Sequence, residues 1–131
     1  MFELNERQEA LQLQARELAE STIAPRAAEV DRTEEYPWDN IEAFTKAGFM
    51  GMTVPADLGG QGRSYLDTVL VIEEMAKVCG ISGRIVVEGN MGAIGAVLAY
   101  GSQQQRELAA KYVLSGDKPA ICITEPNAGS A

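Results

Sequence analysis

Apolar side chains recur at helical spacing through most of the first 116 residues. Over residues 5–29 they fall on one face of a helix, with charged and amide side chains around the rest. The positions on this apolar face are Leu4, Leu11, Ala15, Leu18 and Thr22. Pro25 lies inside the pattern, and we expect it to kink or end the helix because proline lacks a backbone donor.

Four more helices are expected before residue 117. A short helix starts near Trp38 and ends at Gly48, and the apolar residues 49–54 lead from it to a glycine-rich connector at residues 55–62. Ser64 with Asp67, and Ser102 with Gln105, have the spacing of capping boxes, which predicts helices that run to Gly80 and Gly116.

The third of these four helices in chain order covers residues 83–100. It contains Gly89, Gly92 and Gly95, each of which costs about 1 kcal/mol in an exposed helix. Such residues are better suited to a helix that packs closely against a neighbour or a ligand.

The pattern changes after Pro119. Ile121, Cys122 and Ile123 form a short apolar run suited to a buried strand, and a Glu-Pro turn and a loop of small residues follow. We therefore expect an all-α domain over residues 1–118, followed at 119–131 by the first strand of an incomplete β domain. Backbone amides and hydroxyls at the end of such a strand could bind a flat, anionic cofactor. The alternative is a plain core strand with a type I or II turn.

Composition narrows the function. The 131 residues are 46% hydrophobic and carry a net charge of −8, from 11 Lys and Arg against 19 Asp and Glu, which argues against nucleic-acid binding. Histidine is absent, so the commonest general base, a His-Cys metal site and a Ser-His triad are excluded.

Cys79 and Cys122 suggest buried thiols in a reducing compartment. With no signal peptide and no apolar run near the ~20 residues of a membrane span, we expect a soluble, cytoplasmic protein.

Several motifs together resemble the acyl-CoA dehydrogenase family. The most specific is Thr-Glu-Pro-Asn-Ala-Gly-Ser at residues 124–130, which is similar to the family's signature at the junction of its α and β domains. The weaker matches follow in the family's order: residues 55–62, 73–76 and 100–102, with Gln105. The resemblance implies an N-terminal helical domain of an FAD-dependent enzyme that acts on an acyl-CoA thioester, in a homo-oligomer that is a tetramer in the family.

Residue roles follow from this resemblance. Ile121, Cys122, Ile123 and Thr124 would line the flavin, and Ser130 would contact both FAD and the CoA part of the substrate. The family usually has Asp after this serine, whereas this chain has Ala131. The family's glutamate base lies in the C-terminal domain, so we expect no catalytic residue in residues 1–131, no metal ligand, and no activity from this segment alone.

Arg84 is the only cation in the otherwise apolar stretch 81–87. Family members that act on acyl groups with an anionic tail, such as glutaryl-CoA, are similar in placing arginine here. A guanidinium can bind a carboxylate or sulfinate with two parallel hydrogen bonds. The alternative is an ordinary surface pair with Glu88 at i, i+4, worth about 0.2–0.5 kcal/mol.

Three segments, residues 36–40, 48–52 and 116–131, most resemble a desulfinase subgroup of the family. This subgroup releases sulfite from 3-sulfinopropanoyl-CoA without net oxidation. Two alternatives stay open: oxidation of the α,β bond of a glutaryl or short-chain acyl-CoA, and a non-catalytic helical interaction module. Two structural expectations complete the prediction. Glu73 and Glu74 should form a solvated face or an interdomain pair, and Trp38 should be a packing anchor.

Overall fold

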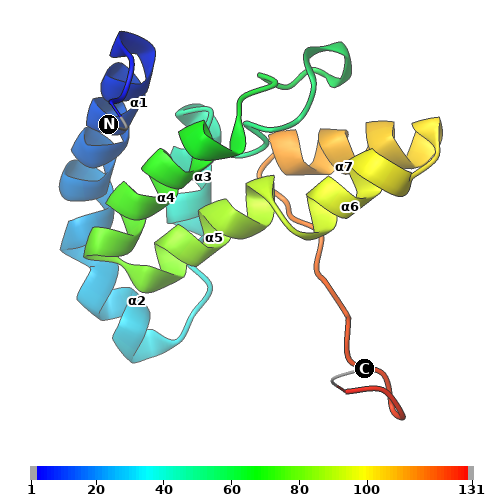
Figure 1. The fold of residues 1–131 in the computed structure, drawn as a ribbon. Coiled ribbons are helices and arrows are strands. Elements are labelled where there is room, and N and C mark those ends of the chain that lie inside the picture. The colour runs from blue at the N-terminus through cyan, green and yellow to red at the C-terminus, as the bar shows by residue number, and fades with distance from the viewer. Residues whose placement is uncertain (1–2, 130–131) are drawn as a thin grey trace.

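The structure is a computed structural model that describes residues 3–129. Within that range the chain forms seven α-helices (Figure 1): α1 Glu6–Leu18, α2 Ala27–Thr33, α3 Trp38–Lys46, α4 Tyr65–Val78, α5 Gly80–Asn90, α6 Ala93–Tyr100 and α7 Gln103–Leu114. A π-helical turn, Ala19–Ile23, and a 3₁₀ turn, Ala24–Arg26, join α1 to α2, and a second 3₁₀ turn covers Ala56–Leu58. The expected helical class is confirmed.

The break expected near Pro25 is present, and it changes which residues of this segment are buried. In the π-helical turn the backbone N–H of Ala24 donates to the Ala19 carbonyl, five residues earlier. This wider turn shifts the apolar stripe by one position. The expected buried residue Thr22 is therefore exposed, and Ile23 is buried in its place.

Both expected capping boxes form. The Asp67 N–H donates to the Ser64 hydroxyl at 3.1 Å, and the Gln105 N–H donates to the Ser102 hydroxyl at 3.3 Å. A third capping box starts α1 at Asn5. In each case the cap satisfies backbone donors that have no partner inside the helix.

The helix expected over residues 83–100 is two helices. Gly92 has φ +62°, a left-handed conformation that ends α5 and starts α6 in a new direction. The close packing expected of these glycines is present at Gly89, where an added Cβ would lie 2.6 Å from the Met50 methyl carbon.

Two apolar clusters form the core. The larger one joins α1, α3, α4 and α5 and includes Phe44, Met52 and Met75, all with no exposed surface. The smaller one lies between the end of the 49–54 segment, α6 and α7. In Figure 1, α1, α4 and α5 pack side by side, and α6 and α7 form a separate antiparallel pair. No helix among residues 3–129 is long and apolar enough to cross a bilayer.

Three expectations about single side chains are wrong. The Glu74 side chain is only 2% exposed, because it lies against α1 and pairs with Arg16. Trp38 is 65% exposed, because it starts α3 on the outer surface and packs edge-on against Tyr36 rather than in the core. Cys79 is buried as expected, but Cys122 is exposed on the C-terminal segment.

Residues 122–129 extend away from the helices (Figure 1). Their only pairing is an isolated bridge between Glu125 and Ala128, and no strand forms among residues 3–129. A strand needs a neighbouring strand to pair its backbone groups, and the described residues provide none. The expected strand at 119–131 is therefore not formed within this range, and its side chains are not packed as interior.

Candidate functional site

A small cavity lies where the C-terminal segment passes the end of α5. Its volume is about 260 Å³, and it is bounded by α5, the turn at Gly92, the start of α6 and residues 118–121. Both Arg84, the expected substrate-binding residue, and Ile121, an expected cofactor-binding residue, line it. The structure thus brings together two residues that are 37 positions apart (121 − 84).

Glu88 is the centre of a charged cluster in this cavity. Its Oε1 accepts a hydrogen bond from Arg84 Nε at 3.0 Å, and its Oε2 accepts one from Lys118 Nζ. The i, i+4 pair that the sequence offered as the alternative for Arg84 is therefore present. The Arg84 side chain is nevertheless 70% exposed, and Nε is its only nitrogen in a hydrogen bond within residues 3–129.

Glu88 and Lys118 each stabilise the charged form of the other. The hydrogen bond from Lys118 lowers the pKa of Glu88, against the opposing effect of burial, and Arg84 lowers it further. The hydrogen bond to Glu88 raises the pKa of Lys118, also against burial. Two cationic side chains and one carboxylate give the cluster one net positive charge.

Lys118 also contacts an aromatic side chain. Its ammonium lies 5.5 Å from the centroid of the Tyr36 ring, and Tyr36 in turn meets Trp38 edge-on with ring centroids 4.9 Å apart. A cation over a ring face is attracted by the ring's negative π surface. Lys118 could not be predicted from the sequence, because no local pattern relates it to Glu88 or Tyr36.

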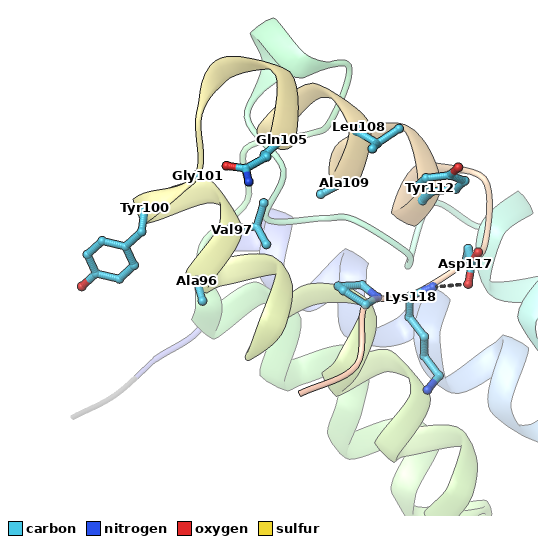
Figure 2. A pocket seen from close by; sticks show the side chains of 11 residues that line it. Ala96, Val97, Tyr100, Gly101, Gln105, Leu108, Ala109, Tyr112, Asp117 and Lys118 are labelled. Atoms are coloured by element: carbon cyan, nitrogen blue, oxygen red, sulfur yellow. Dashed lines mark hydrogen bonds between the residues drawn. The ribbon is translucent and has the colours of Figure 1, made fainter. Parts of the chain in front are cut away.

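A larger, mostly apolar groove of about 590 Å³ lies on the other side of Lys118, between α6 and α7 (Figure 2). It is lined by Ala96, Val97, Tyr100, Gly101, Gln105, Leu108, Ala109, Tyr112, Asp117, Lys118 and Pro119. Lys118 and Pro119 border both hollows. Residues 118–119 therefore separate the charged cavity from the apolar groove.

The other expected cofactor-binding residues lie apart from these hollows. Cys122, Ile123 and Thr124 are exposed on the C-terminal segment, and Ile123 is 76% exposed. The described part of the chain supplies no second wall for them. Ser130 lies outside the described residues.

Asn90 fixes the end of α5 beside the charged cavity. Its side-chain amide donates to the carbonyls of Phe49 and Val86 at 2.7 and 2.9 Å, and its Oδ1 accepts from the Met52 N–H at 2.6 Å. Asn90 is fully buried. It acts as a local hydrogen-bonding residue that ties α5 to the 49–54 segment and holds the turn at Gly92.

The chain is similar to known proteins in both sequence and fold. The chain is 63% identical to the 3-sulfinopropanoyl-CoA desulfinase of Paraburkholderia xenovorans over all 131 residues, which are 34% of that protein. The structure superposes on a chain described as the electron transferring flavoprotein of Acidaminococcus fermentans, with a TM-score of 0.89, 28% identity, 99% of this chain and 34% of that one. It also superposes on butyryl-CoA dehydrogenase from Megasphaera elsdenii, with a TM-score of 0.85, 25% identity, 98% of this chain and 35% of that one.

The chain spans about a third of the length of these proteins. Residues 5–117 match the family described as acyl-CoA dehydrogenase, N-terminal domain, and this range covers every helix of the structure. The chain therefore belongs to the acyl-CoA dehydrogenase family.

Proposed function

We propose that residues 1–118 are the N-terminal helical domain, and residues 119–131 the start of the middle β domain, of an FAD-dependent enzyme that acts on a short acyl-CoA with an anionic tail. The reaction that we favour is release of sulfite from 3-sulfinopropanoyl-CoA. In this reaction the C–S bond at the β carbon breaks, and water completes the balance to propanoyl-CoA and hydrogen sulfite. The 63% identity to the named desulfinase over all 131 residues supports this choice.

The observation that carries the proposal is that the Arg84 guanidinium has terminal nitrogens with no hydrogen bond within residues 3–129. Its guanidinium lines the charged cavity, and only Nε is in a hydrogen bond within residues 3–129. The two terminal nitrogens can therefore bind the two oxygens of a sulfinate or carboxylate in parallel. A substrate with a methyl end would form no such pair with the two terminal nitrogens.

The exposed C-terminal segment fits a flavin in its chemistry. Ile121 and Ile123 expose apolar side chains suited to a flat ring, and Thr124 exposes a hydroxyl. Residues 120–124 make no backbone hydrogen bond within the described part of the chain, so their amides can donate to a partner. Bound FAD would supply the electron-accepting ring that oxidising enzymes of this type need. We further propose that Cys122 and Ser130 contact the flavin and that Ser130 also contacts the CoA part of the substrate. We propose that the full-length protein is a cytoplasmic tetramer.

The test uses the full-length protein that contains residues 1–131. We expect it to release sulfite from 3-sulfinopropanoyl-CoA, and we expect Arg84→Met to lower kcat/KM for this substrate by roughly a hundredfold, the size of a lost charge-assisted pair. Arg32→Met, which changes an exposed arginine on α2, is the control and should have no effect. Equal activity of the Arg84→Met variant would contradict the anion-binding role.

The similarity to butyryl-CoA dehydrogenase supports a second candidate, oxidation of the α,β bond of a short acyl-CoA. The two reactions give different products. Reduction of an artificial electron acceptor by glutaryl-CoA or butyryl-CoA, without sulfite release from 3-sulfinopropanoyl-CoA, would favour oxidation. The coding sequence after residue 131 gives a further criterion, because an oxidising enzyme needs a free carboxylate base, whereas the carboxylate that lines the cavity, Glu88, is already paired with Arg84 and Lys118.

A further inference from the structure

Lys118 and Glu88 have no role in the function proposed above. We propose that Lys118 is a positioning residue that determines acyl-tail specificity: by pairing with Glu88, it keeps Glu88 from neutralising Arg84 and so leaves Arg84 able to bind an anionic tail. This inference rests on the proposed function, since it assumes that Arg84 binds the tail.

The distribution of hydrogen bonds in the cluster supports this role. Glu88 has two carboxylate oxygens, and each one accepts from a different cation. Because Lys118 occupies Oε2, Arg84 reaches Glu88 through Nε and Oε1 alone. Without Lys118, both oxygens of Glu88 would be free to form the two-bond pair with the guanidinium that a substrate tail would otherwise form.

The net charge leads to the same conclusion. With Lys118 the cluster has two cations and one anion, so it attracts a monoanionic tail. Without Lys118 the charges of Arg84 and Glu88 cancel, and the Glu88 carboxylate would repel an anion in a cavity of about 260 Å³. The pKa of Glu88, lowered mainly by Lys118, agrees with this coupling.

Contacts with neighbouring residues hold Lys118 where its ammonium can pair with Glu88. The ring of Tyr36 lies beside its ammonium, and its backbone N–H donates to the Asp117 carboxylate at 2.8 Å. Figure 2 shows its side chain running away from Leu108 and Tyr112, so that the ammonium points out of the apolar groove. The side chains of Lys118 and Glu88 are 24% and 29% exposed, which shields their pair from water better than the Arg84 contact.

The test compares two ligands of equal length. Succinyl-CoA carries a carboxylate where 3-sulfinopropanoyl-CoA carries its sulfinate, and butyryl-CoA carries a methyl group there. The ratio of their dissociation constants on the full-length protein, measured by calorimetry, reports the preference for an anionic tail whichever reaction the enzyme performs.

We expect Lys118→Met to lower this preference roughly tenfold, the size of one charge-assisted hydrogen bond, with little change in butyryl-CoA binding. Lys118→Arg keeps the positive charge and should keep the preference. The double variant Lys118→Met/Glu88→Gln removes the competing carboxylate and should recover the preference to within about threefold of the unchanged protein. Lys46→Met, which breaks another Lys-Glu pair with Nζ–Oε1 2.6 Å on α3, is the matched control and should have no effect.

Two results would overturn the inference. The first is an unchanged preference in Lys118→Met. The second is a double variant that stays as weak as Lys118→Met, because Lys118 would then bind the tail itself. Arg84→Met separates this inference from the proposed function. If Arg84→Met leaves the preference for succinyl-CoA unchanged, the proposed function fails; if it abolishes the preference while Lys118→Met does not change it, only the role of Lys118 fails.

Discussion

Arg16 of α1 holds Glu74 of α4 through two hydrogen bonds, from Nε at 3.1 Å and from Nη2 at 3.2 Å. Lys77, one helical turn after Glu74, donates to the same carboxylate at 2.8 Å. The carboxylate is buried between the two helices and is satisfied by both cations. This contact ties the first helix of the domain to the helix at its centre.

Removing this carboxylate should destabilise the domain. In Glu74→Gln, two cations lose a charged acceptor at the α1–α4 contact, and we expect the free energy of unfolding to fall by about 1–3 kcal/mol. Chemical denaturation of the full-length protein measures the change. The neighbouring Glu73 is half exposed and pairs with Lys77 only at 3.6 Å, so Glu73→Gln should change stability by less than about 0.5 kcal/mol. Equal effects of the two substitutions would contradict the buried role of Glu74.

The same pair predicts how stability depends on pH. Hydrogen bonds from Arg16 lower the pKa of Glu74 in the folded protein, against the opposing effect of burial. A lowered folded pKa means that the stabilisation is fully present above the unfolded value, about 4.3 for glutamate, and is lost as the pH falls towards the folded pKa. Denaturation midpoints of the unchanged protein and Glu74→Gln should therefore differ most above about pH 5 and converge below about pH 4. A difference that stays constant between pH 7 and 3 would show that ionisation of Glu74 is not responsible.

Asn90, at the end of α5, gives a second prediction about stability. Asn90→Ala leaves the Met52 N–H and the Phe49 carbonyl buried without this partner, and we expect a loss of about 2–4 kcal/mol. Gln104→Ala, which removes an exposed amide on α7, is the control and should be nearly neutral. Thermal unfolding of the full-length protein compares them. A neutral Asn90→Ala would mean that water replaces the side chain.

The features that the sequence predicted correctly are those that local chemistry determines. The capping boxes at Ser64 and Ser102 need only a hydroxyl and an acceptor three residues later, and both form. The kink at Pro25 follows from the missing N–H of one residue. The π-helical turn beside it was not predictable, because the apolar stripe carries no separate signal for one wider turn.

The features that were missed depend on partners distant in sequence. Glu73 and Glu74 are the same residue type in adjacent positions. Glu74 is the buried one, and it pairs with Arg16, which lies 58 residues earlier, whereas Glu73 is half exposed. The pairing of Lys118 with Glu88 spans 30 residues in the same way. Around the candidate site the sequence predicted roles for Arg84 and Ile121 and offered the pair of Arg84 with Glu88, whereas the pairing of Lys118 with Glu88 became visible only in the structure.

Two glycines of α5 provide a matched pair for the last prediction. At Gly83 an added Cβ would lie 2.8 Å from the Cβ of Ala76, where α5 crosses α4, so Gly83→Ala should force the helices apart and lower the free energy of unfolding by about 1–3 kcal/mol. At Gly80 an added Cβ would meet nothing within 4 Å, so Gly80→Ala should be neutral or stabilise by up to about 1 kcal/mol through its better helix propensity. The compensating change Ala76→Gly should rescue Gly83→Ala only in part, because the backbone Cα and N of residue 76 would still lie 3.0 and 3.1 Å from the added Cβ. Denaturant titration of the three variants measures this. If Gly83→Ala is as harmless as Gly80→Ala, then α4 and α5 do not approach as closely as the structure places them.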